Sequence, residues 1–200
     1  RLLILTPHLC RPFGKGRDGT VIGEGAGVLI LESERHASLR KAVPYARMLG
    51  YGLSCDARSL TIPSEQGMVA VMRKALDNSR VKARDVSLVC AHGTGTVNND
   101  LCEARAIRAV LRTGSRRVPV TSLKPAVGHT FGASSAIEAA ACCLSIRDGL
   151  IPFTLNTVER DPACGVDVVM SSPRRGQADV ACNNSFAFGG NNACTVFSGP

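Results

Sequence analysis

Alternating apolar and polar runs along the chain predict a succession of strands and helices. The apolar run over 21–32 indicates a buried strand, and its glycines predict close approach of a neighbouring element. A short polar helix is expected over 33–41 and a second strand over 45–54. Ser64 is the expected N-cap of the next helix. The apolar face of that helix comprises Met68, Val71, Met72, Ala75 and Leu76.

The second half of the pattern continues the alternation. A strand over 86–90 leads to His92 and precedes an amphipathic helix. The expected apolar side of this helix holds Leu101, Ala104, Ile107, Val110 and Leu111, and the polar side holds Glu103, Arg105, Arg108 and Arg112. The remaining elements are a strand over 118–121, an Ala- and Cys-rich helix over 133–147 that packs on both sides, and closing strands over 166–170, 180–185 and 193–197. Strands that alternate with helices indicate α/β layering.

Composition narrows the class of protein. The 200 residues are 44% hydrophobic, include 20 glycines and are only 4% aromatic without tryptophan, which suits a closely packed α/β protein. This length fits one domain or half of a larger one, and because the first residue is Arg1 we expect the chain to begin within a longer protein. No apolar run is long enough to span a membrane, so no membrane partner is expected.

Charge and cysteine usage exclude further classes. The net charge of +8 arises from short clusters over 80–84, 116–117 and 174–175, without the long basic tract of a nucleic-acid-binding protein. Such clusters suit either an acidic protein partner or a solvated face. The nine cysteines are odd in number, lie mostly in apolar runs and lack zinc-site spacing. We expect reduced, mostly buried thiols, no metal site and a cytoplasmic location.

Two histidines carry the candidate chemistry. His92 lies in the glycine-containing loop 91–96 and His129 in the loop 124–130, each after an apolar run. Histidines at strand ends donate or relay a proton to a bound carbonyl. Two donors that converge on one oxygen would stabilise a thioester oxyanion or an enolate.

Structural explanations compete at the other polar positions. Asp100 and Glu103 have the spacing of a helix cap with a reaching carboxylate, as well as of a substrate contact. His129 is equally explained as a buried core histidine, and Lys124 with Glu138 as an ordinary buried pair. The Gly-Gly-Asn-Asn run over 189–192 is typical of a hairpin turn.

The order of several short motifs resolves this ambiguity. They are Arg-Pro-Phe at 11–13, Arg-Asp-Gly at 17–19, Gly-Glu-Gly-Ala-Gly at 23–27, His-Gly-Thr-Gly-Thr at 92–96, Lys124, Gly-His-Thr at 128–130, Glu138 and Asn-Ser-Phe-Ala-Phe-Gly-Gly-Asn at 184–191. Together they resemble the β-ketoacyl-acyl-carrier-protein synthases (ketosynthases), from about Leu9 to Phe197. The resemblance implies a thiolase-like αβαβα layered fold. Residues 1–41 would end its N-terminal half, and 42–200 would form its C-terminal half.

This resemblance implies a decarboxylative condensation in fatty-acid or polyketide synthesis. In the family a cysteine takes an acyl group from acyl carrier protein, and the enolate of a malonyl thioester then attacks it. The implied catalytic residues are His92 and His129, which donate hydrogen bonds to the malonyl thioester oxygen as it becomes an enolate. Lys124, paired with the supporting residue Glu138, would fix their protonation and orientation.

Substrate contacts and partners follow from the same resemblance. Thr94 and Thr96 would bond the amides of phosphopantetheine, which the carrier protein brings; the chain itself would bind no cofactor. Phe188 would gate the acyl pocket and supply an oxyanion-hole N–H, with Gly189 beside it in the substrate-binding set. The implied partners are acyl carrier protein and a second ketosynthase-like chain, as homodimer or heterodimer.

Three departures from the family pattern lead to alternatives. The nucleophilic cysteine would lie upstream of Arg1, so we expect no condensing activity from this chain alone. The segment 5–10 joins two motifs that the family separates by a helix. Ala187 and Ser135 replace usual glycines, and the methyl group of Ala187 would stiffen the gating loop, whereas Ser135 lies near the second histidine. The alternatives are a non-catalytic partner of the chain-length-factor type and a degenerate fragment that exposes an apolar sheet face.

Overall fold

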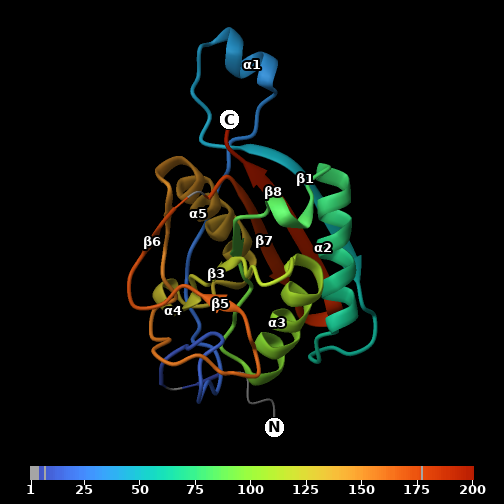
Figure 1. Ribbon diagram of the computed structural model, residues 1–200, viewed down its shortest axis with the longest axis vertical. Coiled ribbons are helices and arrows are strands. Elements are labelled where there is room, and N and C mark those ends of the chain that lie inside the picture. The colour runs from blue at the N-terminus through green and yellow to red at the C-terminus, as the bar shows by residue number, and fades with distance from the viewer. Residues whose placement is uncertain (1–4, 7, 177) are drawn as a thin grey trace.

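A mixed six-stranded sheet organises the chain in this computed structural model, which describes residues 5–6, 8–176 and 178–200 (Figure 1). The strand order is β1-β8-β7-β2-β3-β5. These strands are β1 (Arg47–Cys55), β2 (Leu88–Cys90), β3 (Pro119–Thr121), β5 (Asp167–Val168), β7 (Val180–Phe186) and β8 (Asn191–Ser198). β1, β8 and β7 pair antiparallel, whereas β7, β2, β3 and β5 are parallel. The strands β4 (Leu150–Ile151) and β6 (Arg174–Arg175) form a small separate antiparallel pair.

Helices cover both faces of this sheet (Figure 1). The helices are α1 (Glu34–Leu39), α2 (Glu65–Ser79), α3 (Val97–Leu111), α4 (Lys124–Val127) and α5 (Ser134–Asp148). Short 3₁₀ turns cover Ala83–Asp85, Phe131–Ala133 and Phe188–Gly190. α2 and α3 bury one apolar cluster against the sheet, and α5 helps to bury a second. The predicted α/β layering is confirmed.

Local sequence explains why α2 lies where it does. The Ser64 side chain accepts a hydrogen bond from the Gly67 N–H at 3.2 Å and so begins the helix. All five predicted apolar residues are buried. The β1 residue Gly52 permits the close approach, because a Cβ there would lie 2.3 Å from the Val71 carbonyl oxygen.

The predicted strand over 21–32 is wrong. A single parallel bridge joins Ile22 to His129, and the rest of this run belongs to no strand. Val28 and Ile30 are 86% and 85% exposed, because no described segment pairs with them. The run then leads into α1, which projects from the body of the molecule (Figure 1). An apolar run produces a buried strand only where neighbouring strands are present.

The same run does confirm the expected close approach at its glycines. A Cβ on Gly23 would lie 2.1 Å from the Val127 carbonyl oxygen, and one on Gly27 would lie 2.7 Å from the Ala136 Cβ. The segment therefore lies against α4 and the first turn of α5.

The remaining elements agree in order, with several corrections. α5 buries one face and leaves Leu144 exposed on the other, so the expectation of tight packing on both sides is wrong over its second half. The strand expected over 166–170 shortens to β5, and β4, β6 and α4 are too short for periodicity to reveal. Glu103, expected on the polar side of its helix, is completely buried.

Three properties of the described chain bear on its class. The nine cysteines are free thiols, most of them buried. In the described residues we find no group of three or more His, Cys, Asp or Glu side chains able to hold a metal ion. None of the helices in this part of the chain combines the length and apolar character needed to cross a membrane.

Candidate active site

The two predicted histidines meet where neighbouring parallel strands end. His92 follows β2, His129 follows β3 by way of α4, and β2 pairs with β3. The centroids of the two imidazole rings are 5.4 Å apart, with their planes at 81°. Phe186, at the end of β7, contacts His92 edge-on with ring centroids 5.9 Å apart. The sheet therefore brings together two loops that are distant in sequence, with an aromatic side chain beside them.

Glu103 fixes the His92 loop. Its Oε1 accepts the backbone N–H of His92 at 2.9 Å and its Oε2 accepts that of Gly93 at 2.8 Å. Asn184 of β7 donates to the same Oε1 at 3.2 Å. Burial raises the pKa of this carboxyl to about 7, although these N–H donors favour the ionised form. Glu103 therefore acts on a loop preceding its own helix, and the capping interpretation is wrong for it.

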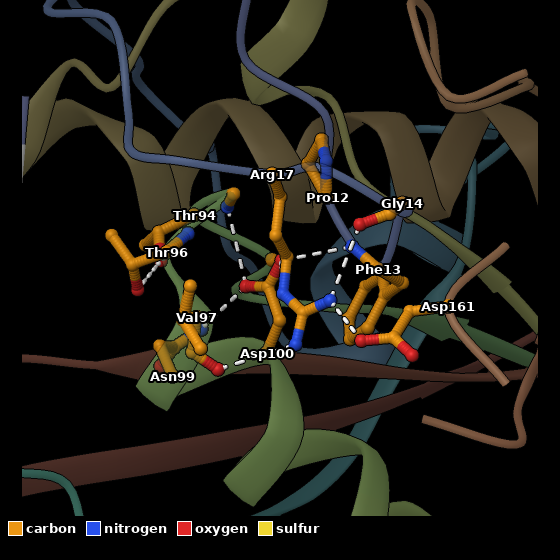
Figure 2. A network of polar contacts seen from close by, with 12 residues as sticks. Pro12, Phe13, Gly14, Arg17, Thr94, Thr96, Val97, Asn99, Asp100 and Asp161 are labelled. Carbon is orange, nitrogen blue, oxygen red and sulfur yellow. Dashed lines mark hydrogen bonds and ion pairs between the residues drawn. The ribbon is translucent and has the colours of Figure 1, made fainter. Parts of the chain in front are cut away.

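Asp100 ties the other end of this loop to an upstream segment (Figure 2). Its Oδ1 accepts the Gly95 N–H at 3.2 Å, and its Oδ2 accepts the Phe13 N–H at 2.8 Å. The N-cap of α3 is Thr96, without a side-chain bond, so Asp100 is not the cap either. Burial raises the pKa of the Asp100 carboxyl to about 6. Both carboxylates are thus structural supports of the His92 loop.

Arg17 completes this network (Figure 2). Its Nε lies 3.7 Å from Asp100 Oδ2, and its Nη1 donates to Asp161 at 2.5 Å. Further bonds reach the carbonyl oxygens of Gly14 at 3.2 Å and Val97 at 3.3 Å. One buried guanidinium therefore joins the segment 11–19, the start of α3 and the 161 loop.

Lys124 lies behind the histidines with only 1% of its surface exposed. Its Nζ is 2.5 Å from Glu138 Oε1 and also donates to the backbone carbonyl of His92. Burial raises the pKa of Glu138, and the nearby ammonium opposes this shift. The expected pair is present, and it connects α4, α5 and the His92 loop.

The environment of His129 selects its tautomer. The Phe131 backbone N–H donates to His129 Nδ1 at 3.2 Å, so Nδ1 is the acceptor and the ring proton belongs on Nε2. Ser134 Oγ also lies 3.2 Å from Nδ1, and the Phe131 ring stacks on the imidazole with centroids 4.7 Å apart. His129 is therefore oriented as an Nε2–H donor.

Both histidines are neutral at pH 7. Burial lowers the pKa of His92 well below 6.5, with the Lys124 charge and His129 acting in the same direction. Burial, followed by Lys124, lowers the pKa of His129 to about 4. A neutral imidazole offers one donor and one acceptor, which suits a hydrogen bond to a developing oxyanion.

Backbone contacts from the segment 21–23 hold His129 in place. The His129 N–H donates to the Val21 carbonyl at 2.7 Å, and the Gly23 N–H donates to the His129 carbonyl at 3.1 Å. Gly128 adopts a φ of +75°, and a Cβ there would lie 2.6 Å from Gly23. Two glycines in contact therefore permit the bridge that positions this histidine.

The other predicted site residues lie around this centre. Thr94 is buried in the His92 loop, and its Oγ1 is 2.9 Å from that of Thr96. Phe188 is half exposed in the connection between β7 and β8, where Gly189 adopts a φ of +79° and donates to the Leu60 carbonyl at 2.8 Å. The two glycines thus lie in the predicted hairpin connection, and Asn191 and Asn192 begin β8.

Cys10 lies beside the His92 loop, but it does not have the environment of a nucleophile. Its thiol donates to the Thr94 carbonyl at 3.3 Å. Burial and Asp100 raise the pKa of Cys10 to about 11, so its thiolate is scarce at neutral pH. Cys10 is therefore not suited to act as the nucleophile.

Sequence reasoning missed several residues of this centre. Arg17 and Phe186 lie in motifs, but the sequence assigns no role to either of them, and Ser134 lies in no motif. The Asp-x-x-Glu spacing at 100 and 103 was the available signal, because one helical turn directs both carboxylates to the same side. Their targets are backbone N–H groups, which leave no mark in the sequence.

The sheet order, its two covered faces and the histidine pair define a thiolase-like ketosynthase. The solved structure described as the ishigamide ketosynthase/chain length factor superposes with a TM-score of 0.96 at 43% identity, covering 100% of this chain and 49% of that one. A beta-ketoacyl synthase from Burkholderia phymatum STM815 gives a TM-score of 0.91 at 38% identity, covering 98% of this chain and 47% of that one. The expected fold class is confirmed.

Sequence comparison identifies the family. Residues 45–158 match the C-terminal domain of beta-ketoacyl synthases, and residues 1–37 match their N-terminal domain. The chain belongs to the beta-ketoacyl synthase family. Nodulation protein E of Rhizobium meliloti is 43% identical over 96% of this chain and 48% of its own length. The 3-oxoacyl-[acyl-carrier-protein] synthase 2 of Synechocystis is 42% identical over 95% and 46%, so the chain spans about half of each relative.

Proposed function

We propose that this chain is the histidine-bearing part of a 3-oxoacyl-[acyl-carrier-protein] synthase that condenses a malonyl thioester with an acyl thioester. The observation that supports this most directly is the convergence of two neutral, loop-anchored histidines at 5.4 Å. A pair of preorganised N–H donors matches a reaction in which negative charge develops on one thioester oxygen.

In the proposed reaction, loss of carbon dioxide supplies the electron pair that forms the new carbon–carbon bond. When the malonyl carboxylate leaves as carbon dioxide, the electrons of the broken carbon–carbon bond form an enolate whose charge rests mainly on the thioester oxygen. His92 and His129 donate hydrogen bonds to that oxygen. The enolate carbon then attacks the acyl thioester of a cysteine from the remainder of the protein, and the cysteine leaves as thiolate.

Other residues of the site have supporting roles in this proposal. Lys124 does not contact the reacting carbon; with Glu138 it holds the His92 carbonyl and disfavours protonation of both rings. Thr94 and Thr96 face each other with hydroxyls suited to phosphopantetheine amides. Phe188 and Gly189 occupy a half-exposed hairpin connection suited to gating an acyl pocket.

Partners follow from the reaction and from the neighbours. A solved structure at 34% identity and a TM-score of 0.92 is described as a type II PKS acyl-carrier protein in complex with its ketosynthase bound to the hexaketide; the match covers 96% of this chain and 48% of that one. We propose acyl carrier protein as the substrate donor and a second ketosynthase-like chain as dimer partner, in the cytoplasm. In this proposal residues 1–41 end the N-terminal half, and residues 42–200 form the C-terminal half.

The test measures carbon dioxide release from malonyl carrier protein by the full-length protein. His92→Ala and His129→Ala are each expected to lower the decarboxylation rate by about 10²–10³-fold, the typical effect of removing one oxyanion donor. His36→Ala, which removes an exposed histidine of α1, is the matched control and should retain the wild-type rate. Retained decarboxylation in His129→Ala would remove this residue from the proposed role.

A non-catalytic partner subunit is the second candidate. Similarity to the ketosynthase/chain length factor structure favours it, whereas the complete set of His92, Lys124 and His129 favours catalysis. The residue at the nucleophile position of the full-length protein decides between them. A cysteine there that becomes acylated by an acyl carrier protein supports the synthase, and any other residue supports the partner subunit.

A further inference from the structure

An arginine-rich surface on α3 has no part in the proposed chemistry. Arg105, Arg108 and Arg112 are exposed at helical spacing, and two adjoining hollows of about 220 and 260 Å³ share the last two. Arg117, just before β3, lines the hollow of about 220 Å³, and we call these four side chains the arginine groove. The buried side chains Ile107, Leu111, Val118 and Val166 also line that hollow.

Most of the positive charge in the arginine groove is uncompensated. Two carboxylates also line it, Glu65 and Asp167. Glu65 lies 3.8 Å from Arg105, while Asp167 receives two hydrogen bonds from Arg174, which lies outside the groove, at 2.6 and 3.0 Å. This leaves Arg108, Arg112 and Arg117 without a carboxylate partner among the described residues.

Helix stability does not account for this arrangement. Arg105, Arg108 and Arg112 repel one another at spacings of three and four residues, and none of the three has an acidic residue one turn away on α3. The helix dipole favours Arg112 in the C-terminal region but not Arg105 in the middle of the helix. An external acidic group would relieve the repulsion.

The arginine groove is remote from the histidines. Val118 precedes β3 and Val166 precedes β5, so the groove lies at the amino ends of these parallel strands. His92 follows the carboxyl end of β2, which is parallel to β3. A ligand in the groove therefore leaves the proposed active site free.

The distribution of charge favours an extended partner over a compact anion. The three arginines of α3 span about 10 Å along the helix at 1.5 Å per residue, rather than converging on one point. The end of α3 beside the hollow of about 220 Å³ presents carbonyl groups, whose partial negative charge opposes a compact anion. A helical segment with spaced carboxylates and one apolar side chain matches both the arginines and the apolar wall.

We propose that the arginine groove docks an acidic amphipathic segment of a partner protein, at a surface separate from the one through which carrier-bound substrates reach the histidines. Contacts with the 164–165 segment orient Arg108. Its Nη1 donates to the Cys164 carbonyl at 3.5 Å, and a Cβ on Gly165 would lie 3.2 Å from the same Nη1. The carboxylates of the partner would pair with Arg108, Arg112 and Arg117, and its apolar side chain would enter the hollow of about 220 Å³.

The test uses the full-length protein and a fluorescein-labelled acidic peptide, helical when bound, with glutamates at i, i+3 and i+7 beside a leucine. Fluorescence anisotropy should show saturable binding that weakens at higher salt concentration. Arg108→Glu/Arg112→Glu should raise the Kd by at least about tenfold, equivalent to about 1.4 kcal/mol. Arg73→Glu/Arg80→Glu, the same charge change at an exposed position of α2 and at its exposed C-cap, should leave the Kd within about twofold on that scale.

Two further arms decide specificity and location. A scrambled peptide of the same composition should bind at least about tenfold more weakly; equal binding, or no binding of the designed peptide, overturns the proposal. Arg108→Glu/Arg112→Glu should release carbon dioxide from malonyl carrier protein with unchanged KM and kcat. A raised KM would make the groove the carrier's own docking surface and overturn the separate site, whereas an inactive wild-type protein would count against the proposed function alone.

Discussion

The Nζ of Lys124 lies 2.5 Å from Glu138 Oε1 in the interior of the protein, and the same ammonium donates to the backbone carbonyl of His92. Removing one partner leaves the other charge buried and unpaired. Glu138→Ala in the full-length protein is therefore expected to lower the free energy of unfolding by about 3–5 kcal/mol, measured by chemical denaturation. Lys124→Met/Glu138→Leu should be less destabilised than Glu138→Ala; simple additivity of the two single changes would contradict this coupling.

Replacement of Glu103 by glutamine is expected to lower both the stability and the activity of the protein. In Glu103→Gln one N–H acceptor becomes an NH₂ group that faces the backbone N–H of His92 or Gly93. We expect a loss of about 1–3 kcal/mol in the free energy of unfolding of the full-length protein, with a lower kcat because His92 shifts. Glu159→Gln, at an exposed carboxylate, is the control and should change neither quantity. Unchanged stability and kcat in Glu103→Gln would show that Glu103 does not support the loop.

The Glu103 carboxyl should make the free energy of unfolding depend on pH, with a sign that follows from its raised pKa. Burial raises the folded-state pKa of Glu103 from 4.5 to about 7, so its contribution to stability is complete below 4.5 and is lost as pH rises through 7. His129 acts oppositely: its pKa falls from 6.5 to about 4, and stability falls as pH drops across that window. The difference between wild type and Glu103→Gln in unfolding free energy, measured from pH 4 to 8, isolates the Glu103 contribution. A pH-independent difference would contradict the raised pKa.

Decarboxylation should not titrate at the ordinary histidine pKa. Burial and the Lys124 charge keep both rings neutral. Titration of His92 and His129 is therefore expected to cause no change in the decarboxylation rate from about pH 8 to about pH 5. Steady-state carbon dioxide release across this pH range measures the rate. Circular dichroism at each pH checks that the protein remains folded. A clear inflection near 6.5 that His129→Asn removes would contradict the lowered pKa.

Gly128 is expected to tolerate no side chain. A Cβ there would lie 2.6 Å from Gly23 at a φ of +75°, so Gly128→Ala must separate the two segments and move His129. The decarboxylation rate of the full-length protein should fall by at least about tenfold, or about 1.4 kcal/mol in the barrier. Gly132→Ala, where a Cβ would meet no atom within 4 Å, should retain the wild-type rate. Equal rates for the two variants would contradict the importance of this contact.

Sequence patterns predicted those elements whose signals lie within the element itself. Ser64 and the five apolar residues of α2 were placed correctly because the cap and the buried face both lie within one helix. The run over 21–32 was misassigned because burial of Val28 and Ile30 requires strands that the described chain does not contain.

The candidate site likewise contains residues that the sequence predicted and supporting residues that it did not. The juxtaposition of His92 with His129 followed from two similar loops, each after an apolar run, and the Lys124–Glu138 pair followed from the family resemblance. The supports of the site were not predictable, because Glu103 and Asp100 bind backbone N–H groups whose positions only the folded chain defines. Their helical spacing is equally typical of an exposed polar face.

The bridge between Ile22 and His129 has a consequence for biosynthesis. During translation from the amino terminus, the segment that anchors His129 leaves the ribosome long before His129 itself. The histidine pair therefore assembles only when early and late parts of the chain have met. A product truncated before His129, or one in which the early segment has not met the late one, would lack this arrangement.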